Sequence, residues 1–360
     1  MEYIALKDVC RINMGQSPES TSYNESGNGI PFFQGNADFG ERYPMTRIWC
    51  NAPTKVANAG DILISVRAPI GALNYAKEKC CIGRGLAAIT PDSSRFSAEF
   101  IYWFLKGKNA ELNTKGTGST FKAIGRKVLE ETLVPNYGFE QQNTCAANLE
   151  KVYSIIQMRR QELQKLDEII SARFVEMFGD PVVNDRGWQK ITLLESLEAG
   201  RTVTYGIVQT GDEFENGIPV FRPIDIAGGH IPKREELKKT DPLISAQYKR
   251  TLLKGNELLI TVRGSVGETF QTTDEFKGCN VGRNIVPLVT DSNIVLQRFL
   301  QELFAQDAIK NWLKGITKGI ALQGLNMGEF KEMPVIAPPI TMQRAFVVFA
   351  LQVDKSKLAC

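Results

Sequence analysis

The chain has 360 residues, of which 43 are Lys or Arg, 40 are Asp or Glu and one is His, so its formal charge at pH 7 is only +3. With 43% hydrophobic and 23% charged residues it has the composition of a globular protein, and its length suggests about two domains with separate cores. Its apolar runs are far shorter than the ~18 residues that span a membrane, and it begins with no secretory leader, so we expect a cytoplasmic protein without membrane attachment.

The first half of the chain predicts short strands followed by a helix. After the string Gly29–Phe33 comes Ile62–Val66, a β-rich apolar run bounded by Gly60 and Gly71. Ala98–Lys106 has the apolar spacing of an amphipathic helix. This mixture indicates an α/β or α+β domain with a twisted sheet.

Residues 140–177 contain neither Gly nor Pro, which predicts a long helix that ends at Gly179 and Pro181. Its seam has the alternating three- and four-residue spacing of a coiled coil and consists of Leu149, Val152, Ile156, Arg159, Leu163, Leu166, Ile170, Arg173 and Met177. At ~1.5 Å per residue the helix reaches ~57 Å, more than a compact domain needs. We therefore favour a spacer helix, with a core helix as the alternative.

The second half of the chain repeats the first. The matching strings are Gly29–Phe33 with Gly217–Phe221, Asp61–Arg67 with Glu257–Arg263, Ile82–Arg84 with Val281–Arg283, and Leu133–Asn136 with Val335–Pro338. They occur in the same order, and Leu296–Phe304 repeats the amphipathic helix. The repeat predicts two homologous domains, roughly 1–180 and 181–360. The second long helix, from Gln343, is only about half the length of the first.

The sequence lacks the motifs of most catalytic sites. It contains no phosphate-binding P-loop, no complete dinucleotide fingerprint and no C-x-x-C pair. Gly179–Val182 lacks the second proline and the aromatic residue of an adenine methylase loop. The single histidine, His230, lies in a Gly-rich turn and is expected to be a solvated loop residue. These absences exclude Ser-His-Asp hydrolysis and multi-histidine metal sites.

One string resembles a catalytic set. Asp225, Glu236 and Lys238 loosely match the carboxylate and lysine groups of magnesium nucleases, which hold a hard cation and activate water. The intervening Arg234–Lys239 is more simply explained as a solvated charged run. A magnesium nuclease is nevertheless kept as the alternative function.

Taken together, the duplicated strings resemble the specificity (S) subunit of type I restriction-modification enzymes. The resemblance covers the whole chain and depends on the repeat and on Tyr205–Gly211, Gly60–Gly71 and Gly118–Gly125. It implies α/β (α+β) target recognition domains in tandem repeat, separated by long coiled-coil helices. The implied segments are a first recognition domain at 1–139, a central spacer helix at 140–180, a second recognition domain at 181–341 and a short distal helix at 342–360.

The resemblance also implies a non-catalytic function. Each half is expected to read one part of a bipartite sequence in double-stranded DNA, while the helices set the spacing and dock two methyltransferase (M) subunits. Restriction and translocase (R) subunits join these. No cofactor is expected in this chain, because S-adenosylmethionine, ATP and Mg would bind the partner subunits. The short distal helix departs from the family, which usually has two long antiparallel helices.

Basic residues near Gly-rich loops are the candidates for phosphate contact, and side chains with forked donors or acceptors are the candidates for base reading. The predicted DNA-binding residues are Gln34, Asn36, Arg67, Arg84, Lys115, Lys122, Arg126, Lys127, Arg222, Arg263, Arg283, Lys318 and Gln323. Gln34, Asn36 and Arg222 are predicted to read bases because they follow the repeated string and differ between halves. For Arg67 and Arg263 two roles stay open: phosphate contact, or a structural pair with Asp61 and Glu257.

A third hypothesis for the chain is a scaffold that binds only proteins. Sequence-selective DNA binding by the complex would contradict it.

Overall fold

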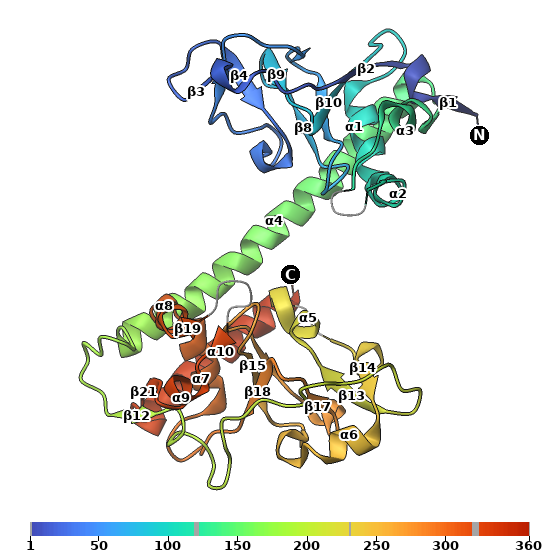
Figure 1. Ribbon diagram of the computed structural model, residues 1–360. Helices are drawn as coiled ribbons and strands as arrows, with labels where there is room; N and C mark the ends of the chain where they lie inside the picture. Colours follow the sequence, from blue (N-terminus) through green and yellow to red (C-terminus); the bar gives the residue numbers. More distant parts are fainter. Residues whose placement is uncertain (1, 119–121, 230–231, 319–323, 360) are drawn as a thin grey trace. The chain divides into compact units, whose positions relative to one another are not determined.

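The computed structural model describes residues 2–118, 122–229, 232–318 and 324–359 (Figure 1). Its internal contacts group the chain into two units, residues 1–158 and 159–360. Helix α4, Phe139–Phe178, supplies residues to both. The division falls inside this helix, so the predicted segment boundaries remain predictions.

The first unit is built on two larger sheets. One is antiparallel with the order β2-β10-β7-β8, and the other is mixed with the order β3-β5-β4-β9-β6, in which β4 and β9 are parallel. The strands are β1 Tyr3–Ala5, β2 Cys10–Met14, β3 Tyr23–Asn24, β4 Ile30–Phe33, β5 Trp49–Cys50, β6 Val56–Ala57, β7 Ile62–Ser65, β8 Leu73–Tyr75, β9 Cys80–Ile82, β10 Leu86–Pro91 and β11 Leu133–Pro135. The helices are α1 Ala98–Gly107, α2 Asn109–Thr114 and α3 Arg126–Glu130.

The second unit contains smaller sheets with the orders β14-β13-β17, β16-β15-β18, β12-β21 and β19-β20. The strands are β12 Lys190–Thr192, β13 Ile218–Phe221, β14 Lys238–Thr240, β15 Leu258–Thr261, β16 Thr269–Gln271, β17 Asn280–Val281, β18 Ile285–Leu288, β19 Thr317–Lys318, β20 Gly324–Leu325 and β21 Pro334–Ile336. The helices are α5 Pro223–Ile226, α6 Pro242–Ala246, α7 Gln297–Ala305, α8 Asp307–Gly315, α9 Met327–Lys331 and α10 Ile340–Ala359.

Strand register confirms the predicted repeat. Strands β4 and β9 pair in parallel with Phe33 opposite Ile82, and β13 and β17 pair in parallel with Phe221 opposite Val281. Each unit also has three antiparallel strands in the same arrangement, β10-β7-β8 in the first and β18-β15-β16 in the second. The predicted amphipathic helices are present as α1 and α7. The fold is thus the tandem α/β arrangement that the sequence predicts.

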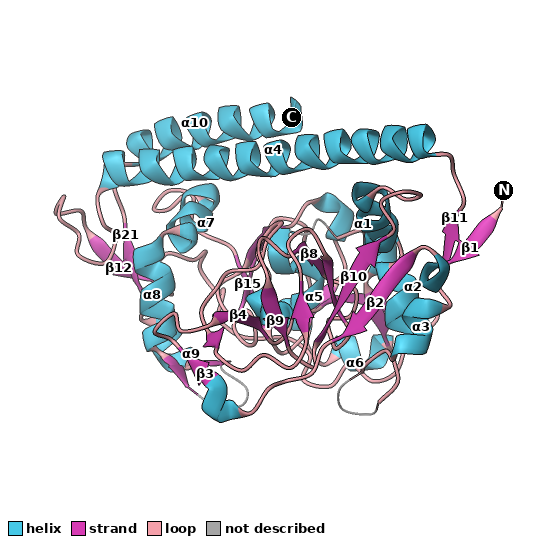
Figure 2. Cartoon of the chain, turned by 90° about the horizontal axis from the view of Figure 1, so that it is seen from above, coloured by secondary structure: helices cyan, strands magenta, loops and turns pink. Residues whose placement is uncertain are grey.

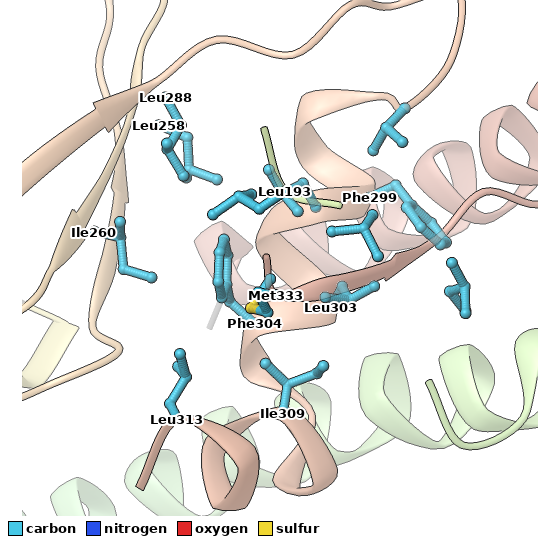
Figure 3. Packing of buried hydrophobic residues seen from close by; sticks show 14 of the residues in the cluster. Leu193, Leu258, Ile260, Leu288, Phe299, Leu303, Phe304, Ile309, Leu313 and Met333 are labelled. Atoms are coloured by element: carbon cyan, nitrogen blue, oxygen red, sulfur yellow. The ribbon is translucent and has the colours of Figure 1, made fainter. Parts of the chain in front are cut away.

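The core of the second unit joins sheet, helices and the end of α4. Leucines and isoleucines of β15 and β18 pack against apolar side chains of α7 and α8, including Phe304 and Leu313 (Figure 3). On the other side of α7, Phe299 stacks on Phe174 of α4 with ring centroids 5.2 Å apart. Phe346 of α10 meets the same ring edge-on at 5.4 Å. This aromatic cluster ties both long helices to the sheet domain.

Helices α4 and α10 pack together along the C-terminal part of α4 (Figure 2). In this C-terminal part of α4 the buried side chains are Ile170, Phe174 and Phe178, so the contact uses Phe174 where the predicted seam has Arg173. Lys357 of α10 bonds to Asp167 of α4 at 2.6 Å. Earlier seam residues are exposed by 37 to 54%: Leu149, Val152, Ile156 and Leu163.

Among the described residues, no helix combines the length and apolar character that crossing a membrane requires.

Candidate nucleic-acid interface

The candidate interface begins where two parallel strands of the first unit end together. Strands β4 and β9 stop at Phe33 and Ile82, so Gln34 and Arg84 leave the sheet at the same edge. The N–H of Gly83 donates to the carbonyl of Phe33 at 2.8 Å, and the N–H of Gly85 donates to that of Gln34 at 3.1 Å. A Cβ on Gly85 would lie 2.4 Å from the Gln34 carbonyl oxygen, so only glycine permits this approach.

These strand ends line a hollow of about 760 Å³. Four of the predicted DNA-binding residues lie on it: Gln34, Asn36, Arg67 and Arg84. They come from three separate segments of the chain. Gln34, Arg67 and Arg84 are exposed, and Asn36 is half-buried. The structure therefore brings both predicted base readers of the first half together with two of its predicted cationic contacts, Arg67 and Arg84.

The hollow contains two functional candidates that the sequence did not indicate. The Asp38 carboxylate accepts the backbone N–H of Gln34 at 2.7 Å and pairs with the Arg47 guanidinium at 2.6 Å. Arg47 also donates to the Ala37 carbonyl at 2.9 Å. Asp38 thus fixes the loop that carries Gln34 and Asn36. Its position four residues after Gln34 was the available signal, since Asp often caps a turn.

Arg67 is held by its backbone and not by its side chain. It forms a β-bridge with Ala123, and the N–H of Ala68 donates to the Lys122 carbonyl at 3.0 Å. This bridge ties the segment containing Lys122 to the rim of the hollow. Both Arg67 and Lys122 are exposed, and neither forms an ion pair within the described part of the chain.

Of the two roles left open for Arg67, the structural pair with Asp61 is wrong. Asp61 is buried, and its carboxylate accepts from the Thr90 hydroxyl at 2.7 Å and from the N–H of Asn58 at 2.8 Å. It anchors the turn before β7, and both of its carboxylate oxygens are bonded inside the fold. Arg67 is left facing solvent.

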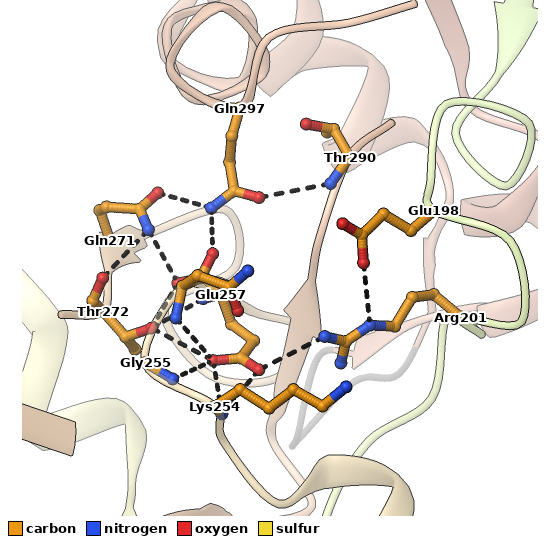
Figure 4. A network of polar contacts seen from close by, with 10 residues as sticks. Glu198, Arg201, Lys254, Gly255, Glu257, Gln271, Thr272, Thr290 and Gln297 are labelled. Carbon is orange, nitrogen blue, oxygen red and sulfur yellow. Dashed lines mark hydrogen bonds and ion pairs between the residues drawn. The ribbon is translucent and has the colours of Figure 1, made fainter. Parts of the chain in front are cut away.

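The matching pair of Arg263 and Glu257 is also wrong. Glu257 is fully buried and accepts from the N–H groups of Lys254 at 2.9 Å and Gly255 at 3.0 Å (Figure 4). Its ion-pair partner is Arg201, 3.7 Å away. Arg263 is exposed and forms a β-bridge with Gly324, as Arg67 does with Ala123.

Three other predicted phosphate contacts already have acidic partners. Lys115 pairs with Glu111 at 2.7 Å, Lys127 with Glu131 at 3.7 Å and Arg126 with Glu130 at 3.6 Å. Arg126 also donates to the carbonyl of Ile12. Hydrogen bonds from Lys108 and Lys115 lower the pKa of Glu111 to about 2. Such exposed pairs contribute little stability and can be exchanged for a phosphate at small cost.

The second unit repeats the strand-end arrangement with different side chains. The N–H of Gly282 donates to the Phe221 carbonyl at 2.9 Å, so Arg222 and Arg283 leave β13 and β17 side by side. Arg283 is exposed. Lys318 ends strand β19, and Gln323 lies outside the described residues, as does His230.

The alternative of a magnesium nuclease that uses Asp225, Glu236 and Lys238 is wrong, because each of these groups bonds to another partner in the structure. The Asp225 carboxylate pairs with Arg222 at 2.9 Å, and Glu236 pairs with Lys233 at 3.7 Å. The ammonium of Lys238 donates to the Gly211 carbonyl at 2.5 Å. In the described ranges, no three His, Cys, Asp or Glu side chains gather in a way that could hold a metal ion.

Comparison with known proteins agrees with this arrangement. The family described as "Type I restriction modification DNA specificity domain" matches residues 1–168 and 186–359. The type I restriction enzyme EcoBI specificity subunit of Escherichia coli is 22% identical over 96% of this chain and 77% of that protein. The putative type I restriction enzyme MjaX specificity subunit of Methanocaldococcus jannaschii is 41% identical over 44% of this chain. The matched part covers only 37% of that protein's length.

A solved structure shows the same fold. The S subunit of a type I restriction-modification system from M. genitalium aligns with 99% of this chain and 90% of its own, with a TM-score of 0.51 and 17% identity. The match to the family extends over nearly the whole chain and includes both halves of the repeat. This chain therefore belongs to the specificity subunits of type I restriction-modification systems, a family of DNA-specificity proteins that are not themselves catalytic.

Proposed function

We propose that each half of the chain reads one part of a bipartite sequence in double-stranded DNA. The observation that carries this proposal is the repeated strand end. Both units place two side chains at the edge of a parallel strand pair, and these are Gln34 with Arg84 in one and Arg222 with Arg283 in the other. Arg84 and Arg283 are the arginine common to both halves, while Gln34 and Arg222 differ. Two domains that recognise different sequences need such a common phosphate contact beside a variable base contact.

The contacts divide into two kinds. Gln34, Asn36 and Arg222 read base edges, since amide and guanidinium groups have the forked geometry that distinguishes base pairs in the major groove. Arg67, Arg84, Lys122, Arg263 and Arg283 contact phosphates, since they are exposed cations near the strand ends. Lys115, Arg126 and Lys127 join them by exchanging their carboxylate partners, and Lys318 and Gln323 serve the second half.

The helices and partners complete the function. Residues 140–180 separate the recognition domains 1–139 and 181–341 and set the distance between half-sites, with 342–360 as the distal helix. Two methyltransferase subunits dock on these helices, and restriction subunits join the complex. We expect S-adenosylmethionine, ATP and Mg to bind those partner subunits, as in the family that the chain belongs to.

A domain exchange tests the proposal. Residues 1–139 are replaced by those of another such subunit, and the methylated motif is read from the genome of a host that also expresses the methyltransferase partner. We expect one half of the motif to change and the other to stay intact. A change in both halves would contradict independent readers. If the complex with the wild-type chain showed no sequence preference, the chain would instead be a scaffold that binds only proteins.

A further inference from the structure

Arg222 differs from the other candidate base readers because the protein holds its side chain in place. The Asp225 carboxylate accepts the Arg222 side-chain Nε–H at 3.2 Å and Nη2–H at 2.9 Å. Asp225 is almost buried, with 10% of its side chain exposed, whereas 41% of the Arg222 side chain is exposed. The Nε and Nη2 edge of the guanidinium is therefore held by Asp225, while the rest of the side chain is open to solvent.

Among the described residues, Asp225 is the partner that the Arg222 guanidinium bonds to, which leaves one complete fork of donors available. A guanidinium can donate through the edge formed by Nε and Nη2 or through the edge formed by Nη1 and Nη2. Asp225 occupies the first edge, and the second faces away from the carboxylate. Two parallel N–H groups at this spacing match O6 and N7 of guanine in the major groove. Holding the long side chain in advance also lowers the entropy lost on binding.

The fold does not need an arginine at this position. The same Asp225 carboxylate accepts the backbone N–H of Arg222 at 2.7 Å, which caps the end of β13. In the first half Asp38 caps the backbone N–H of Gln34 with the same 2.7 Å bond, and the side chain there is an amide. The capping bond is thus common to both halves, while the side chain at the strand end varies.

We propose that Arg222, positioned by Asp225, selects a guanine in the half-site read by the second half of the chain. This inference rests on the proposed function and adds the identity of one base. Arg222 is the specificity-determining residue, and Asp225 is a positioning residue that acts through it.

The test uses the full-length chain expressed with its methyltransferase partner, and it reads the methylated motif by genome sequencing. Arg222→Lys keeps the charge but removes the fork. We expect the guanine position to become degenerate, with a loss of about 5- to 150-fold in preference over the other bases, the range of one bidentate contact. Arg222→Gln should move the preference toward adenine, which an amide fork matches.

Two controls separate base reading from other roles. The first half of the motif should be unchanged in both variants, and Arg250→Lys, at an exposed arginine of the same unit, should leave the whole motif unchanged. Asp225→Asn should weaken preference at the guanine position alone. Thermal unfolding of each variant checks that the second unit still folds.

Several results would overturn the inference. These are a second half-site without any G·C pair, an unchanged motif in both Arg222 variants, or an equal loss of methylation at all sequences. If Asp225→Asn blurred the whole half-site, Asp225 would support the loop and not aim the arginine. If the wild-type complex showed no bipartite motif, the proposed function itself would fail, which is a different readout.

Discussion

Two buried glutamines join the long helices to the bodies of their domains, and removing one of them should be costly. The side-chain oxygen of Gln142 accepts the N–H of Ser97 at 2.9 Å, and its amide donates to the carbonyls of Arg95 at 3.0 Å and Tyr137 at 2.8 Å. The residue has no exposed surface. Gln343 makes the matching bonds to Leu296, Ile294 and Pro338 in the second unit.

Gln142→Ala leaves the buried N–H of Ser97 and the part-buried carbonyls of Arg95 and Tyr137 without their partner. An unpaired buried group costs about 1 to 3 kcal/mol, and the lower value suits the part-buried carbonyls, so we expect a loss of about 3 kcal/mol in the free energy of unfolding of the first unit. For a unit of this size that loss lowers its Tm by roughly 6 to 12 °C. The carbonyl partners belong to the segments that precede α1 and α4, so the start of α4 should loosen.

The assay is scanning calorimetry of the full chain, with hydrogen exchange at residues 95–142 to locate the effect. Gln141→Ala is the matched control, since Gln141 is the same residue type one position earlier on α4 and is exposed. It should change Tm by less than 2 °C, within the ~0.5 kcal/mol typical of surface substitutions. Equal effects of the two substitutions would refute the assignment of the stability to these three hydrogen bonds.

Three further predictions concern charge, thiols and helix length. Lys122→Gln should lower the magnitude of the slope of log K against log salt by roughly one in DNA binding by the complex and weaken all sequences alike, and an unchanged slope would assign Lys122 to a solvated surface. Iodoacetamide at pH 8 should label Cys145 before Cys10 and Cys80, because burial raises the pKa of each of the latter thiols to about 12, as peptide mass spectrometry can check. Inserting four residues near the exposed Ser154 lengthens α4 by ~6 Å and rotates its far end by about 40°. The methylome should then show one or two more base pairs between unchanged half-sites, and an unchanged spacer with full activity would contradict the role of α4 in spacing.

The sequence predicted the elements well because their signals are local. The strand Ile62–Ser65, the helix Ala98–Gly107 and the absence of Gly and Pro along α4 are all visible within short windows of the chain. The repeat was visible because the matching strings occur in the same order. The fold class followed from these signals without knowledge of any contact.

The partners of charged side chains could not be predicted in this way. Arg126 donates to the Ile12 carbonyl, 114 positions away, and Glu257 pairs with Arg201 from another segment. The structural pairs left open for Arg67 and Arg263 are not formed, because Asp61 and Glu257 are buried and their carboxylates bond to other groups within the fold. The partners of a buried carboxylate depend on how distant segments pack around it, so a local sequence pattern does not predict them.

The repeat contains two kinds of matching position, buried glutamines and exposed strand-end side chains. Their difference explains how the same fold can recognise two different DNA sequences. Gln142 and Gln343 are buried and bond to groups of other segments, so truncating either side chain costs about 3 kcal/mol and the framework tolerates little change there. Gln34 and Arg222 project from strand ends whose backbone is already capped by Asp38 and Asp225. Surface substitutions without such roles usually cost less than about 0.5 kcal/mol. Base-reading side chains can therefore change without changing stability, which makes the specificity of each half separable from its fold.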